Sequence, residues 1–248
     1  MLALFCLRLA SGLLASLLLL RPSQINPRFF RVHFLTALGL MVVAGYFLRT
    51  SADSWTWIAL GAGIGLCFLG SLVWSLDKAP GGIFFIVAAS AVALAGLLHA
   101  AFLTFPDIAV PMLVSDQLTS SLLLGLATTA MLMGHSYLIA PAMSLRPLLT
   151  LIGALFVALL LRGALGGWVL WDWTGEHPLV RLDEVNMLLP VRWMIGLVGP
   201  AALSLFALQS ARIRSTQSAT GILYVVVILT FLGEVVSQVL FQMTSFLV

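Results

Sequence analysis

The chain of 248 residues is 61% hydrophobic and only 8% charged, and its mean hydropathy is +1.13. This composition excludes a water-soluble fold and indicates a protein that crosses a membrane several times. The net charge of +3 comes from the connections between apolar segments, and no basic surface with interleaved aromatic residues indicates nucleic acid as a partner.

Eight apolar stretches have the ~20 residues that a helix needs to cross a hydrocarbon core of ~30 Å. The predicted spans cover residues 2–20, 29–49, 55–76, 82–105, 117–140, 147–168, 190–210 and 219–244. The first stretch carries Arg8 where a cleavable signal peptide would be apolar, so we expect it to remain as a span. We therefore expect an all-α transmembrane bundle that forms one integral membrane domain over residues 1–248.

Charged residues in the connections predict the orientation of the bundle. The following basic residues all lie near the odd-numbered connections: Arg21, Arg28, Arg31, Lys78, Arg146, Arg212 and Arg214. The following acids are assigned to the even-numbered connections: Asp53, Asp107, Asp116, Asp172, Glu176, Asp183 and Glu184. The positive-inside rule then places both termini on the outer side. The longest connection, residues 169–189, is expected to form a short interfacial helix on that side.

Four ionisable residues lie inside the predicted spans, where burial of a charge is costly unless the charge is paired or wetted. At ~1.5 Å of rise per residue, Arg8 lies ~20 Å from the cytoplasmic end, Arg162 and Glu234 ~24 Å, and His99 ~28 Å. We expect these side chains to share one layer in which Glu234 pairs with Arg8 or Arg162. Gln238 follows Glu234 by one helical turn and extends the polar face toward the outer surface.

This outer layer has two interpretations. In the first, the charges are a structural clamp that holds three helices together. In the second, they line a polar pocket for a quinone headgroup, in which Arg8, Arg162 and Gln238 bind, His99 donates to a carbonyl, and Glu234 relays protons.

A second layer is predicted near the cytoplasmic side. His33 and His135 lie at equal depth, ~9 Å from the inner boundary, on the second and fifth spans. Such a pair could ligate a haem b, with the adjacent Gly134 leaving room for the macrocycle. It could also contact a quinone or lipid headgroup, or make interfacial hydrogen bonds without catalytic consequence.

Other motifs argue against a self-contained enzyme. The chain has no Ser-His-Asp order and no metal-ligand spacing, so no metal site is predicted. Three alternate glycines, Gly61, Gly63 and Gly65, lie inside a span, where we expect them to allow close helix packing and not to hold a nucleotide.

The closing segment GEVVSQVLF, residues 233–241, resembles the last helix of membrane anchor subunits of the dimethyl sulfoxide reductase type. The resemblance implies eight spans and electron exchange between quinol and a peripheral iron-sulfur subunit. From this resemblance only Glu234 is assigned a counterpart in the family, as an acidic residue of the last helix. Family members commonly have arginine at the position of Gln238.

The sequence therefore predicts an integral subunit of a respiratory or photosynthetic electron-transfer complex in the cytoplasmic membrane. Its expected role is to provide a quinone-facing polar pocket and a scaffold for membrane and peripheral partner subunits. Two alternatives remain at this point: a small-solute or ion transporter, and a purely structural subunit.

Overall fold

The computed structural model describes residues 1–76, 79–139, 143–176 and 183–244, with side chains described in these ranges except for 172–176, 183–186 and 244. The helices in chain order are α1 (Leu2–Ser16), η1 (Leu17–Leu19), η2 (Pro22–Gln24), α2 (Pro27–Leu48), α3 (Ser54–Val73), α4 (Gly82–Thr104), α5 (Val110–Ile139), α6 (Arg146–Glu176), α7 (Asp183–Pro190), the π-helical segment η3 (Val191–Val198), α8 (Gly199–Arg212) and α9 (Thr216–Thr244). Eight helical stretches are long and apolar enough to cross a membrane, with η1 extending the first and α7, η3 and α8 together forming the seventh. The predicted all-α bundle of eight spans is therefore confirmed.

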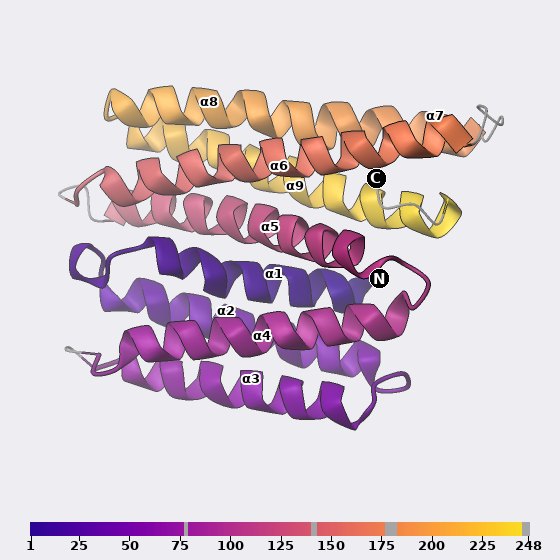
Figure 1. The fold of residues 1–248 in the computed structure, drawn as a ribbon. Coiled ribbons are helices and arrows are strands. Elements are labelled where there is room, and N and C mark those ends of the chain that lie inside the picture. Colours follow the sequence, from indigo (N-terminus) through magenta and orange to yellow (C-terminus); the bar gives the residue numbers. More distant parts are fainter. Residues whose placement is uncertain (77–78, 140–142, 177–182, 245–248) are drawn as a thin grey trace.

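Successive spans run in alternate directions, so the connections fall into two sets at opposite ends of the bundle (Figure 1). Arg21, Arg146 and Arg212 lie at one end, and the N-terminus and the last turns of α9 lie at the other. Lys78, which the sequence assigns to the first of these ends, lies outside the described residues. The arrangement agrees with the predicted sorting of charge, and the outward orientation of the termini stays a prediction.

The eight spans form two groups of four consecutive helices. In the first group α1, α2, α3 and α4 each pack against the next, and α4 returns to α1. The second group closes in the same way through α5, α6, α8 and α9, with η3 continuing the line of α8. Helix α1 also packs along α5 and joins the two groups, which makes it the most buried span of the bundle.

Glycines set the closest helix contacts. A Cβ on Gly12 of α1 would clash with the carbonyl of Ser121 on α5, and one on Gly125 would clash with the backbone of Gly12. Gly196 of η3 and Gly233 of α9 meet in the same way. Small residues let helix backbones approach closely, which is how membrane helices gain packing energy without a hydrophobic driving force between them.

The glycines singled out in the third span are mostly not packing positions. A Cβ on Gly63 would lie 2.9 Å from the sulfur of Met41, as expected for a close contact. At Gly61 and Gly65 a Cβ would meet nothing within 4 Å, so the prediction of close packing is wrong for these two.

Two predicted boundaries are also wrong. Helix α5 begins at Val110, seven residues before the predicted span, so Asp116 lies buried within a helix and not in a connection. Helix α6 continues to Glu176, so the stretch 169–189 is not one interfacial helix; residues 177–182 lie outside the described residues. Helix α5 extends because its additional turns place Asp116 against other helices.

Candidate functional site: a buried ionic network and two cavities

Each helix of the second group contributes one charged side chain to its interior, and α1 adds a fifth. The ionic network consists of Arg8 on α1, Asp116 on α5, Arg162 on α6, Arg192 on η3 and Glu234 on α9. None of these residues is more than 3% exposed. Because the five side chains come from five different helical elements, the network ties both four-helix groups together.

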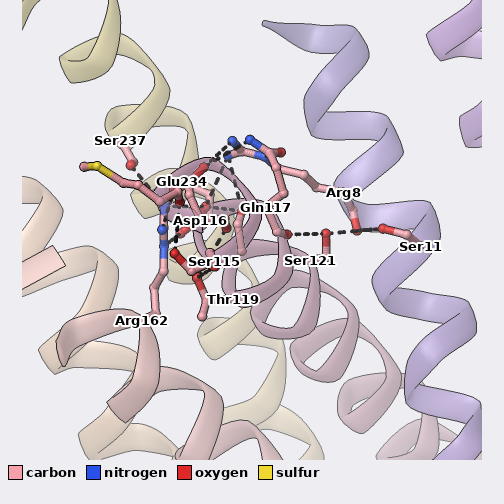
Figure 2. Close-up of polar contacts among 12 residues, drawn as sticks. Arg8, Ser11, Ser115, Asp116, Gln117, Thr119, Ser121, Arg162, Glu234 and Ser237 are labelled. Atoms are coloured by element: carbon pink, nitrogen blue, oxygen red, sulfur yellow. Dashed lines mark hydrogen bonds and ion pairs between the residues drawn. The ribbon is translucent and has the colours of Figure 1, made fainter. Parts of the chain in front are cut away.

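Asp116 bridges two arginines. Its Oδ2 accepts a hydrogen bond from Nη2 of Arg8 at 2.8 Å, and its Oδ1 accepts one from Nη1 of Arg162 at 2.5 Å. The neighbouring Gln117 accepts from Nε of Arg8 at 2.8 Å (Figure 2). Charge-assisted bonds of this kind are about twice as strong as neutral ones, so they fix α1 against α5 and α6.

Glu234 lies among three guanidinium groups. Its Oε1 is 3.1 Å from Nε of Arg162 and 3.1 Å from Nη2 of Arg192, and its Oε2 is 3.8 Å from Nη1 of Arg8. Ser120 on α5 also donates to Oε2. A single carboxylate therefore contacts groups on four other helical elements.

Arg192 is only partly satisfied. Its Nη2 contacts Glu234, but its buried Nε and Nη1 have no hydrogen-bond partner among the described residues. Arginine keeps its charge in proteins, so it cannot relieve this cost by losing a proton. The described part of the network thus holds three positive charges against two negative ones.

A small cavity adjoins the network at the N-terminal end of the bundle. Its volume is about 60 Å³, and we call it the network cavity. Arg8 and Asp116 form its charged wall, and Gln238 and Gln242 on α9 line its side. The buried Nε2 of Gln238 has no hydrogen-bond partner in the part of the chain that the structure describes. A cavity of this size holds a few water-sized groups and not a quinone ring.

The predicted meeting of Arg8, Arg162 and Glu234 is confirmed by these contacts. Gln238 extends the polar face of α9 into the network cavity, as its spacing from Glu234 indicates. The place predicted for His99 is wrong, because its imidazole does not join the network. Helical rise predicts depth along a span but not which neighbour a side chain faces, and His99 faces Asp53.

His99 pairs with Asp53, the residue that precedes α3. Its Nε2 lies 3.0 Å from Oδ2 of Asp53, and both side chains are partly exposed. Asp53 also caps α3 by accepting from the hydroxyl and backbone N–H of Thr56. These hydrogen bonds from Thr56, with a smaller contribution from His99, lower the pKa of Asp53 from 3.8 to about 2.

Sequence reasoning missed Asp116 and Arg192. Both lie at the edges of predicted spans, where a charge is usually solvated. The row Asp116, Gln117, Ser120, Ser121 carried a signal, because residues at these spacings share one face of a helix. That polar face would have extended the fifth span toward its N-terminus.

A larger cavity lies at the opposite end, between α2 and α5. We call it the histidine cavity; its volume is about 320 Å³, and both His33 and His135 line it, as does Arg28. His33 is fully buried, and its Nδ1 lies 2.9 Å from the carbonyl oxygen of Phe29. His135 is exposed. The prediction that these two histidines lie close to each other is thus supported by a shared cavity.

The contact with Phe29 sets the chemistry of His33. A carbonyl oxygen only accepts hydrogen bonds, so Nδ1 carries the proton in this contact. In the neutral ring, Nε2 then presents a lone pair, and it has no partner among the described residues. His33 therefore holds a buried acceptor in the wall of the cavity.

The fold and these sites define a multi-pass helical membrane protein. Comparisons with protein family models, with curated proteins and with solved structures found no match to this chain.

Proposed function

We propose that the protein is a quinone-interacting integral subunit of an electron-transfer complex in the cytoplasmic membrane, and that the histidine cavity receives the headgroup. The observation that carries the proposal is a cavity of about 320 Å³ lined by both histidines, one of which, His33, has a buried Nε2 without a hydrogen-bond partner among the described residues. That volume lies within the ~300–1,000 Å³ of small-molecule pockets, whereas the network cavity is too small.

The walls of the histidine cavity suit an amphipathic ligand. Phe29 supplies an aromatic face beside the two histidines, and Arg28 supplies a cation at the polar end. Val32 and Ile139 also line the cavity and are 49% and 77% exposed, so the cavity opens between apolar side chains. An isoprenoid tail could leave through this opening into the acyl chains of the bilayer while the ring stays inside.

The tautomer of His33 favours the reduced form of the ligand. A hydroquinone hydroxyl donates to Nε2, whereas a quinone carbonyl has no proton to donate. Oxidation of the hydroquinone to the quinone releases two electrons and two protons. His33 would take one proton and become imidazolium, and His135 or water would take the other. The two electrons would leave one at a time to one-electron centres, haem or iron-sulfur, of a partner subunit.

Haem ligation fits this cavity less well. Nε2 of His33 is a suitable axial ligand, and the Nδ1 contact is the kind that orients such ligands. The cavity volume, however, matches one substituted ring and not a macrocycle of four pyrroles. A visible spectrum of the purified protein before and after reduction tests this directly, since a bound haem b gives bands that change on reduction.

Photoaffinity labelling tests the quinone site. An azido-hydroquinone with a short alkyl tail should label peptides covering residues 25–33 and 132–139, and unlabelled hydroquinone should compete. His33→Leu should abolish this labelling, whereas His99→Leu, the matched histidine at the other end of the bundle, should keep it. Labelling that phospholipid removes and hydroquinone does not would contradict the proposal, because the cavity would then be a lipid headgroup site.

Gentle purification tests the partner assignment. The complex should contain a subunit with a haem or iron-sulfur centre, identified by mass spectrometry and its absorption spectrum. Purification without any redox-active partner, together with uptake of a solute into vesicles, would favour a transporter instead.

A further inference from the structure

We propose that the network cavity binds a small monovalent anion, such as chloride or formate, that balances the excess positive charge of the ionic network. This site is independent of the proposed quinone site, since the two cavities lie at opposite ends of the bundle. Two separate observations carry it: the charge imbalance among the described side chains, and a cavity with polar walls that adjoins the network.

The charge imbalance cannot be removed by proton transfer. Arg8, Arg162 and Arg192 keep their charges, and Asp116 and Glu234 are the two carboxylates paired with them. An uncompensated charge in a low-dielectric interior is costly, and the buried Nε and Nη1 of Arg192 show where the network lacks a partner. One additional negative charge would make the described network neutral.

The network cavity provides the place for that charge. It adjoins Arg8, whose guanidinium connects to Arg192 through Glu234. Gln238 lines the cavity, and its buried Nε2 has no hydrogen-bond partner among the described residues. A volume of about 60 Å³ accommodates an ion of the size of chloride with a water, but no phosphate ester or larger anion.

The cavity is accessible from the N-terminal end of the bundle. Gln242, one turn beyond Gln238 on α9, lines it and is exposed, so polar groups continue from the network to the surface. The polar side chains of Thr104, Gln238 and Gln242 therefore line the cavity beside Arg8, together with apolar ones such as Met1 and Phe241. Asp116 shares the wall, but both of its oxygens already accept from arginines, which reduces its repulsion of an incoming anion.

The test uses the full-length protein in detergent. Thermal unfolding is followed in sodium chloride, sodium formate and sodium gluconate at equal ionic strength, and ³⁵Cl NMR line broadening reports direct binding. Chloride and formate should raise the unfolding midpoint with the logarithm of concentration, because an anion that binds only the folded state stabilises it by mass action. Gluconate, which is too large, should have no such effect.

Two variants act on the site in different ways. Gln238→Leu removes the unpaired donor and should abolish the chloride effect, whereas Gln217→Leu, an exposed glutamine on the same helix, should retain it. Arg192→Gln removes the excess charge without touching the cavity wall. It should weaken chloride binding measurably, because a unit charge still attracts an anion across a short distance at an effective dielectric constant of about 20.

Arg212→Gln is the control for general surface charge, since Arg212 is an exposed arginine on the same span. Equal loss of chloride binding in Arg192→Gln and Arg212→Gln would overturn the proposal. So would identical unfolding of the wild type in chloride and gluconate without line broadening, which would mean that the cavity holds water only. If Arg192→Gln does not fold, the comparison of Gln238→Leu with Gln217→Leu decides the question.

Discussion

Replacement of Glu234 by glutamine should strongly destabilise the fold. The substitution keeps the volume of the side chain but removes the charge that contacts Arg162, Arg192 and Arg8. The glutamine oxygen can still accept from one arginine, but its amide group presents N–H donors to guanidinium groups that are also donors. The described network would then hold three positive charges against one negative charge.

The size of the effect follows from the burial of the network. Removal of one partner from a buried ion pair costs about 3–5 kcal/mol, because the other partner stays buried without compensation. Glu234 is fully buried and has three such partners, so we expect at least the lower value. At 1.4 kcal/mol for each factor of ten, this lowers the folding equilibrium constant by about two to four orders of magnitude.

The assay is unfolding in mixed micelles of dodecyl maltoside and sodium dodecyl sulfate, followed by circular dichroism. A double-mutant cycle with Arg192→Gln identifies the cause. If electrostatic imbalance drives the loss, Arg192→Gln should recover more than about 1 kcal/mol of it in the double variant. Strict additivity of the two substitutions, or a loss below about 0.5 kcal/mol for Glu234→Gln alone, would refute the reasoning.

Two further predictions concern other parts of the bundle. Gly12→Ala should prevent stable folding, because its Cβ would clash with the carbonyl of Ser121, whereas Gly61→Ala has free space and should be neutral or stabilising; thermal unfolding in detergent compares them. Asp53 has a pKa lowered to about 2 by hydrogen bonds from Thr56, so the stability that it contributes is complete above pH 3.8 and declines as the pH falls toward 2. The difference in unfolding midpoint between wild type and Asp53→Asn should therefore shrink over that interval, and a difference that stays constant would contradict the assignment.

The sequence was sufficient for the number of spans and for the depth of the buried charges. Hydrophobic length fixes the spans, because every backbone polar group in hydrocarbon must be satisfied within a helix. Depth follows from helical rise, and for this reason Arg8, Arg162 and Glu234 could be placed in one layer before the structure was known. The same argument placed His33 and His135 at equal depth, and in the structure both line one cavity.

These sequence patterns do not predict how each helix is rotated about its own axis. Lipid is as apolar as a protein interior, so an apolar span has no strong amphipathic face that shows which side turns inward. His99 therefore shares a depth with the network but faces Asp53, and Gly61 and Gly65 face no neighbouring helix. Asp116 and Arg192 were missed for a related reason, because a charge at the end of a span is equally compatible with solvent and with a buried partner.

Apolar length and helical rise were enough to predict eight membrane-crossing helices and a common level for Arg8, Arg162 and Glu234. The grouping of the helices into two sets of four joined by α1 and α5, and the meeting of five charges from five helical elements, came from the packing of the bundle. The physical reason is that length and rise act along a helix and are local, whereas ion pairing depends on how helices rotate and pack against one another. That packing is set by contacts such as those at Gly12 and Gly233, between residues far apart in the chain.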